Sequence, residues 1–145
     1  MLIREMGERN MENSARVREY LRECGVFYIA TEDARQPRVR PLNGIYLYEG
    51  KLCIFTPKDS PLYKRLKADP QMEICATHPD KSWISVIGRL NEDQRECVHE
   101  AVVKSYRDSI QDPEALLQCQ MTVFRLDSAR VKVTSVDGNV KECVL

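Results

Sequence analysis

The alternation of polar and apolar positions is clearest in the middle of the chain, where it predicts a β-hairpin. From Arg38 to Tyr48, basic or polar residues alternate with apolar ones, as they do in a strand with one buried face. Glu49-Gly50 supplies residues typical of a tight turn, and Lys51 to Thr56 is an apolar run rich in β-forming residues. Pro57 ends the second strand, because proline cannot donate a hydrogen bond to a neighbouring strand.

The segment after the hairpin predicts a short helix. Asp59 or Ser60 is suited to cap its first amides, and Pro61 is suited to its first turn. The helix is expected to end before Asp69-Pro70. Its apolar stripe comprises Leu62, Tyr63 and Leu66. Its solvated side is expected to comprise Lys64, Arg65 and Lys67.

Further helices and strands are predicted on both sides of this region. Residues 1–11 mix charges without a clear apolar face, and we expect them to fray or to lie across the surface. A helix that starts at Asn13 or Ser14 is expected to end at Gly25. Other helices are predicted from a cap at Asn91 or Asp93 to about Arg107, and over residues 112–118. The other strands are predicted over residues 26–31, 72–77, 83–90, 121–126 and 129–135, with residues 140–145 following a last turn.

This order of elements predicts a mainly β protein with flanking helices, of the α+β class. About six or seven antiparallel strands with two or three helices outside them are expected of a small split β-barrel. The chain has 145 residues, the length of one ordinary domain, and we expect residues 1–145 to form a single domain.

Composition and motifs argue against several classes of function. The 22 basic residues balance 22 acidic ones, so the positive footprint of nucleic-acid-binding proteins is missing. No apolar stretch approaches the ~20 residues that cross a bilayer, and the charged N-terminus does not match a signal peptide, so we expect a cytoplasmic protein without membrane contact. The 6 cysteines form no CxxC pair, which favours reduced thiols, and the 2 histidines lack metal-binding spacing, which predicts no metal site. Hydrolase and nucleoside triphosphatase motifs are missing as well.

A strand, a short polar loop and a helix start follow one another between residues 51 and 68. Backbone N–H groups at a helix start point outward and stabilise negative charge, which is the geometry that binds phosphate. Arg38, Arg40, Lys58 and Lys64 can add positive charge there. Lys64 lies near the helix start, where a cation is unfavourable unless an anion is bound, so the pattern favours a phosphate site.

The same region carries a resemblance to a known family. It contains Arg38, then Phe55-Thr56 and Ser60, then Asp69-Pro70, and a later strand reads Trp83-Ile84-Ser85-Val86-Ile87-Gly88. This pattern resembles the flavin-binding split barrels related to pyridoxamine 5'-phosphate oxidase. The resemblance implies flavin mononucleotide (FMN) as the cofactor, commonly bound across the interface of a homodimer.

The resemblance also implies roles for individual residues. Arg38 resembles the arginine that approaches the flavin phosphate, and Ser60 resembles the serine of the phosphate loop. Pro61-Leu62 stand where the oxidase has an Arg-Lys pair, so the phosphate charge is expected to come from Lys58, Lys64 or Arg40. The residues implied beside the flavin ring and ribityl chain are Val39, Arg40, Pro41, Phe55 and Thr56, with Trp83 where the oxidase has a glutamine.

Three functions are compatible with these residues. The first is an FMN-dependent oxidoreductase or electron-transfer protein that acts on an unidentified small molecule or redox partner. The second is a split barrel that holds another cofactor, such as deazaflavin or haem. The third is a binding or stress-response module without cofactor, which the departure at Pro61-Leu62 favours. The oxidase's C-terminal substrate motif is missing, so the sequence assigns no catalytic residue and leaves open whether the protein is an enzyme.

Overall fold

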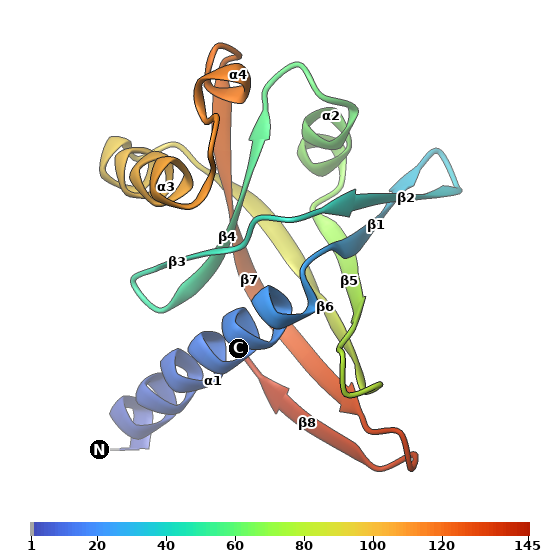
Figure 1. Cartoon of the computed structure of the whole chain (residues 1–145). Coiled ribbons are helices and arrows are strands. Elements are labelled where there is room, and N and C mark those ends of the chain that lie inside the picture. Colours follow the sequence, from blue (N-terminus) through green and yellow to red (C-terminus); the bar gives the residue numbers. More distant parts are fainter. Residues whose placement is uncertain (1) are drawn as a thin grey trace.

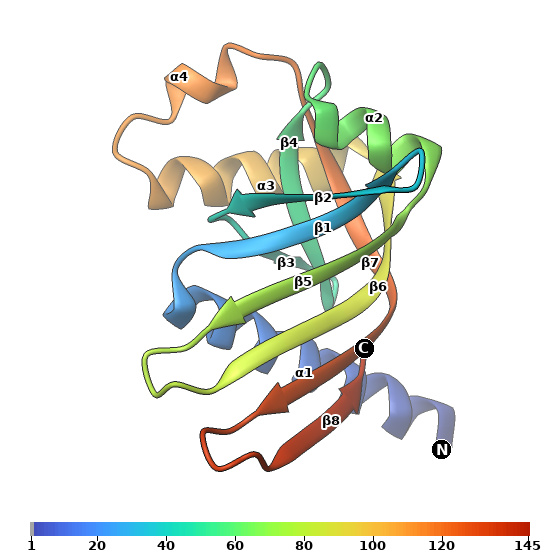
Figure 2. The same cartoon turned by 90° about the vertical axis from the view of Figure 1, so that its right-hand side faces the viewer.

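Eight antiparallel strands form one curled sheet in the computed structural model, which describes the backbone of residues 2–145 and the side chains of residues 11–115 and 117–145. The strands are β1 (Phe27–Asp33), β2 (Gln36–Leu42), β3 (Tyr46–Tyr48), β4 (Lys51–Pro57), β5 (Gln71–Thr77), β6 (Trp83–Asp93), β7 (Met121–Thr134) and β8 (Val140–Val144). The helices are α1 (Leu2–Cys24), α2 (Pro61–Ala68), α3 (Glu96–Ser109) and α4 (Glu114–Leu117). The strand order is β2-β1-β5-β6-β7-β4-β3, and β8 pairs with β7. The sheet therefore ends in two edges, β2 and β3, with α2 beside β1 and β4 (Figures 1 and 2).

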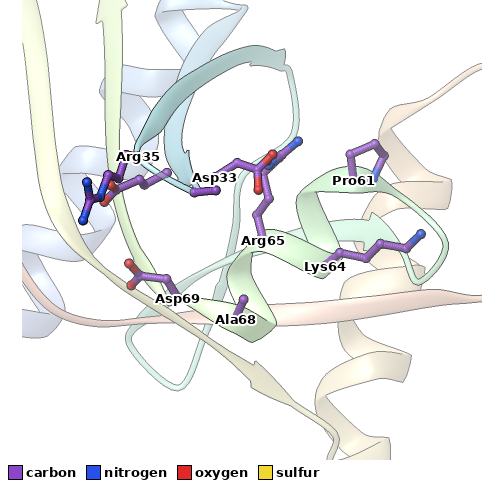
Figure 3. Close-up of a pocket in the computed structure, with 9 residues that line it drawn as sticks. Asp33, Arg35, Pro61, Lys64, Arg65, Ala68 and Asp69 are labelled. Carbon is purple, nitrogen blue, oxygen red and sulfur yellow. The ribbon is translucent and has the colours of Figure 1, made fainter.

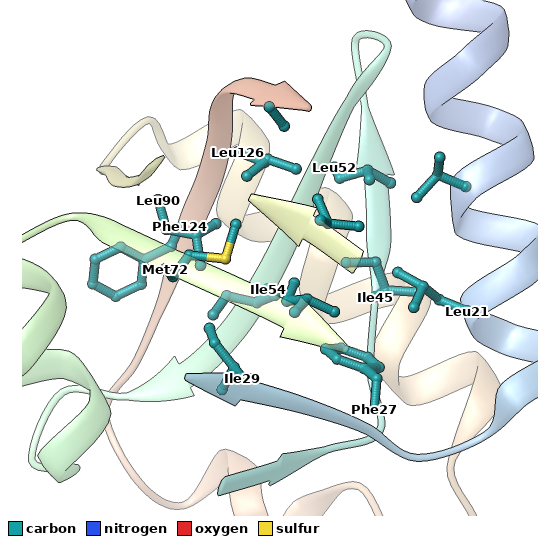
Figure 4. Packing of buried hydrophobic residues seen from close by; sticks show 14 of the residues in the cluster. Leu21, Phe27, Ile29, Ile45, Leu52, Ile54, Met72, Leu90, Phe124 and Leu126 are labelled. Atoms are coloured by element: carbon teal, nitrogen blue, oxygen red, sulfur yellow. The ribbon is translucent and has the colours of Figure 1, made fainter. Parts of the chain in front are cut away.

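The curled sheet encloses the main hydrophobic core (Figure 4). In β5, Met72, Ile74 and Ala76 are buried while the residues between them are exposed, as the two-residue period of a strand requires. Leu21 of α1 and Leu66 of α2 belong to the same core, so both helices cover openings of the curled sheet. The predicted mainly β class is confirmed. Within the described residues, no helix is both long and apolar enough to span a membrane.

Only the second half of the predicted hairpin is present. Residues 38–48, predicted as one strand, belong to β2, which pairs with β1, and to β3, which pairs with β4 through the turn at Glu49-Gly50. Asn43-Gly44 separates the two strands, since neither residue favours extended structure. Alternation along a strand identifies its faces but not its neighbour, which is why the pattern assigned β2 to the wrong partner.

Two helix starts also differ from expectation. The helix predicted from Asn13 or Ser14 begins at Leu2, because no proline interrupts the preceding residues and a helix extends easily once it has started. Met1 lies outside the described residues. α3 begins at Glu96 after Arg95, so neither Asn91 nor Asp93 is its N-cap and both belong to a longer β6.

β7 is one long strand where two were predicted. Ser128 has a φ of 53° and interrupts the regular pairing opposite Ile87 and Arg89, where the register shifts. A β-bulge of this kind bends a strand without ending it. Gly88 lies at the bulge, and a Cβ there would stand 3.0 Å from the Cβ of Ala129. Residues 140–145, to which no strand was assigned, supply β8.

Ion pairs around the buried Asp93 carboxylate join β6 to β7 on the side of the sheet that faces away from α2. The Asp93 carboxylate, whose side chain is 3% exposed, accepts hydrogen bonds from Arg95 at 2.9 Å and from Arg125 at 3.1 Å. Arg125 also pairs with Asp127 at 3.1 Å, and Lys51 of β4 reaches Asp127 at 2.8 Å. The hydrogen bonds from Arg95 and Arg125 lower the pKa of Asp93 to about 2.

Removing Leu21 from the core tests whether α1 is part of the folded unit. Leu21→Ala is expected to lower the free energy of unfolding by about 2–5 kcal/mol, because it leaves a cavity at a fully buried position. Val136→Ala, at a 75% exposed position, is the matched control and is expected to change it by less than about 0.5 kcal/mol. Equal effects in urea titrations would contradict this packing of α1.

Acid titration tests the Asp93 ion pairs. The folded-state pKa of about 2 lies below the ordinary value of 3.8, so Asp93 contributes stability that is present above about pH 4 and is lost as pH falls toward 2. Asp93→Asn is expected to lower the free energy of unfolding at pH 7 by about 2 kcal/mol and to flatten its fall between pH 4 and pH 2. Asp108→Asn removes an exposed carboxylate outside this network and serves as the control. An acid profile of Asp93→Asn that matches wild type would refute the assignment.

Candidate functional site

The start of α2 is built as the sequence predicts, with Ser60 as its N-cap. The Ser60 hydroxyl accepts a hydrogen bond from the amide of Tyr63 at 3.1 Å, and Pro61 follows in the first turn. The hydroxyls of Ser60 and Thr56 lie 3.0 Å apart, so the end of β4 and the start of α2 are joined. The Lys58 amide donates to the Gln120 carbonyl at 2.8 Å, which fixes the loop between them. These residues form a rigid corner where polar groups meet a helix N-terminus.

Three arginines gather between β2 and α2. Arg38 and Arg40 of β2 pair with Thr31 and Ile29 of β1, two buried residues, and therefore lie on the face of the sheet that α2 covers. Arg40 donates to the Thr31 hydroxyl at 3.1 Å. The pKa of Arg40 is lowered, first by its partial burial and then by the positive charges of Arg65 and Arg38. Arg38 and Arg65 thus lie close enough to Arg40 for their positive charges to disfavour the charge on Arg40.

Arg65 holds a central place in this group. Its side chain is 16% exposed and forms an ion pair with Asp33, at the end of β1 (Figure 3). Its Nε is buried and has no hydrogen-bond partner in the described part of the chain. A buried donor without a partner is costly, so this part of Arg65 is suited to an additional acceptor.

A cleft of about 610 Å³ lies between the β1–β2 turn and α2. In Figure 3, Arg65 and Asp33 meet within it, whereas the side chain of Lys64 extends away from this pair. The cleft is lined by Glu32, Asp33, Ala34, Arg35, Pro61, Lys64, Arg65, Ala68 and Asp69. Of the residues predicted to hold the phosphate, Lys64 lines this cleft and Arg38 and Arg40 adjoin Arg65.

Several predicted ring contacts lie on other faces of the same elements. Val39 and Pro41 pair with Ala30 and Tyr28, so their side chains point to the outer face of the sheet, opposite to Arg38 and Arg40. Thr56 faces the corner at α2. Phe55 faces α3, where its ring lies near those of Tyr46, His99 and Tyr106, at centroid distances of 5.7–6.5 Å. The structure does not bring the Phe55 and Thr56 side chains together, and their roles beside a flavin stay predictions.

Trp83 starts β6, at the opposite end of the sheet from the β1–β2 turn. It pairs with Thr77 of β5 and Thr134 of β7, and its side chain is 44% exposed on the outer face. That face carries further exposed apolar residues, which the sequence did not group: Tyr28, Val39, Ile87, Val140 and Val144. Trp83 is therefore remote from the cleft of its own chain.

Comparison with solved structures identifies the fold. A NimC/NimA family protein from Clostridium acetobutylicum has 27% identity and a TM-score of 0.84, with 97% of this chain and 98% of that chain covered. A pyridoxamine 5'-phosphate oxidase-related, FMN-binding protein from Nostoc punctiforme has 13% identity and a TM-score of 0.58, with 92% and 93% covered. A haem-binding protein from Mycobacterium smegmatis has 14% identity and a TM-score of 0.72, with 90% and 57% covered. No family model matches the sequence, and no curated protein matches it significantly.

The chain has the split-barrel fold of the pyridoxamine 5'-phosphate oxidase-like structures. The split-barrel fold predicted from the sequence is therefore confirmed. Proteins of this fold include FMN-binding and haem-binding members, so the fold alone does not select a cofactor. The choice depends on the residues that this split barrel places at its cleft.

Arg65 is the residue of the split barrel that sequence reasoning missed. It was assigned to the solvated side of its helix together with Lys64 and Lys67, but its side chain is largely covered. The sequence does indicate this position, because Arg65 lies three residues after Leu62 and next to Leu66, at the border of the buried stripe of α2. An arginine at such a border extends along apolar surface and places its charged end beside the neighbouring element.

Proposed function

We propose that this split barrel binds FMN with its phosphate at the corner between β2 and α2, and that it serves as an FMN-dependent oxidoreductase or electron-transfer protein. The observation that supports this most is the gathering of Arg38, Arg40 and Arg65 between β2 and α2, the helix that Ser60 caps. Guanidinium groups bind phosphate through paired hydrogen bonds, and the α2 N-terminus adds a favourable dipole. The donor set fits a phosphate monoester.

Arg65 also offsets the departure at Pro61-Leu62. The oxidase resemblance predicts a basic pair at these two positions, and neither residue can bind an anion. Arg65 lies one helical turn after Pro61 and presents its guanidinium to the same cleft. The positive charge is thus supplied from a different position of the same helix, which weakens the case for a module without cofactor.

The free edge of β2 supports placing the flavin ring beside it. Asp33 and Gln36 flank the two-residue turn and form the first hydrogen-bonded pair of the hairpin. Hydrogen-bonded and non-hydrogen-bonded pairs alternate along two antiparallel strands, so the backbone N and C=O groups of Pro37, Val39 and Pro41 point away from β1. Prolines have no N–H to offer there, and strands tolerate them at such places. Val39 is then the donor on this stretch of edge, and we assign its amide to a flavin ring acceptor.

In this assignment the chain binds and orients, and the cofactor carries the redox chemistry when it is bound. The arginines hold the phosphate, the β2 edge fixes the ring position, and a small molecule or redox partner approaches the exposed face of the ring.

Flavin titration tests the cofactor assignment. Wild type is expected to bind FMN saturably, read as quenching of flavin fluorescence, and to bind riboflavin at least about tenfold more weakly, because riboflavin lacks the phosphate. FMN at 100 times its dissociation constant is expected to stabilise the fold by about 2.7 kcal/mol. Preferred binding of haem or deazaflavin would support the second function, and no thermal shift with any of the three would support a module without cofactor. Either outcome contradicts the FMN assignment.

Arg38→Ala tests the phosphate contact. The variant is expected to weaken FMN binding by about 1.5–3 kcal/mol, roughly ten- to a hundredfold, while riboflavin binding stays unchanged, because only the phosphate loses a charge-assisted hydrogen bond. Lys104→Ala removes an equal charge from the exposed side of α3 and is the matched control. Equal weakening of FMN and riboflavin would indicate general damage to the cleft, and an unchanged FMN affinity would remove Arg38 from the site.

We further propose that the protein is a homodimer that associates through the outer face of β1, β5 and β6. An apolar patch of this kind on one sheet face is typical of an interaction surface. A two-fold pair would also bring Trp83, remote from the cleft of its own chain, within reach of its partner's site. The predicted Trp83 contact with the flavin requires such a pair.

Ile87→Glu tests this association. Ile87 is 42% exposed in the middle of the outer face, so a buried glutamate there is expected to convert a dimer to a monomer in sedimentation experiments. Val136→Glu places the same charge at a 75% exposed position in the β7–β8 turn and is expected to leave the dimer intact. A monomeric wild type, or a dimeric Ile87→Glu, would contradict the proposed interface.

A further inference from the structure

The turn between β1 and β2 lies at the mouth of the cleft in an unfavourable backbone conformation. Ala34 and Arg35 have φ values of 45° and 71°, between the paired residues Asp33 and Gln36. A two-residue turn with both φ values positive is favoured by Asn-Gly, whereas alanine and arginine adopt it at a cost in free energy. Such a conformation persists where other contacts hold the segment in place.

The ion pair between Asp33 and Arg65 is the contact that links this turn to α2 (Figure 3). The two partners are anchored very differently. Arg65 is 16% exposed and extends from a helix that Leu62 and Leu66 fix in the core, whereas the Asp33 side chain is 47% exposed at the end of β1. Asp33 is therefore the partner that can leave the pair without disturbing the core.

Positive charge exceeds negative charge around the Asp33–Arg65 ion pair. Among the described side chains, Asp33 is the carboxylate that pairs with the group formed by Arg38, Arg40 and Arg65. The hydrogen bond from Arg65, together with the charges of Arg65 and Arg38, lowers the pKa of Asp33. A phosphate monoester brings more charge and more acceptor oxygens than one carboxylate, so it is the stronger ligand for the same guanidinium groups.

We propose that Asp33 competes with the phosphate of FMN for Arg65 and so sets the affinity and selectivity of the cleft. The proposal rests on the FMN site argued above. In the free protein, Asp33 holds Arg65 and neutralises part of its charge. In the complex, the phosphate takes the Arg65 guanidinium and Asp33 turns to solvent with the β1–β2 turn. Riboflavin has no group that displaces Asp33, so the competition lowers the affinity for FMN alone and narrows the preference of the cleft for FMN over riboflavin.

Asp33→Asn in two backgrounds tests this competition. In wild type, the substitution is expected to tighten FMN binding about two- to fivefold, which is the contribution of an exposed ion pair, and to leave riboflavin binding unchanged. Asp108→Asn removes an exposed carboxylate of α3, outside the cleft, and is expected to have no effect on either ligand. In an Arg65→Gln background, where FMN binding is weaker, Asp33→Asn is expected to give no gain. Arg65→Lys, in which the gain also shrinks, serves if Arg65→Gln does not fold.

The outcomes separate this inference from the function on which it rests. A gain that is equal in the wild-type and Arg65 backgrounds would show a general electrostatic effect and overturn the competition, as would the absence of any gain in a wild type that binds FMN. Failure of wild type and all variants to bind FMN would overturn the proposed function and this inference together. A gain confined to FMN and dependent on Arg65 would establish Asp33 as the internal competitor.

Discussion

The inability of Pro37 and Pro41 to donate hydrogen bonds keeps β2 at the edge of the sheet, and the rest of the site depends on that edge. A strand that offers donors on its free side can pair with another strand, and a curled sheet then closes into a barrel. Here β2 and β3 remain the two ends of the strand order, and α2 lies beside the gap. The cleft lies between α2 and the turn that begins β2, and the Arg38 and Arg40 side chains on β2 add positive charge beside Arg65.

The two groups of arginines in the molecule show how the same residue type serves different purposes. Arg95 and Arg125 lie among Asp93, Asp127 and Glu49, and their charges are neutralised by ion pairs that join β6, β7 and the β3–β4 turn. The group at α2 is paired, within the described residues, with the exposed carboxylate of Asp33. A neutralised group stabilises the fold, whereas a group with excess positive charge is suited to an external anion.

Much of this arrangement could be predicted from local patterns. Local patterns around residues 51–70 predicted β4, the Ser60 cap and α2 correctly. Helix caps, hydrophobic periodicity and prolines each depend on residues that are neighbours in the sequence. The partner of β2, the length of β6 and the place of Arg65 could not be predicted, since they depend on which distant strands and helices come together. Trp83 and Phe55 show the same limit, because alternation places them on a face without saying what covers that face.

The central claim is that the arginine group between β2 and α2 binds the phosphate of FMN. A crystal structure of the protein with FMN tests it most directly. The account predicts the phosphate within hydrogen-bond distance of Arg38 and Arg65, with Asp33 no longer paired to Arg65 and the ring beside Val39. A phosphate bound elsewhere, or an FMN complex in which Asp33 still holds Arg65, would contradict it.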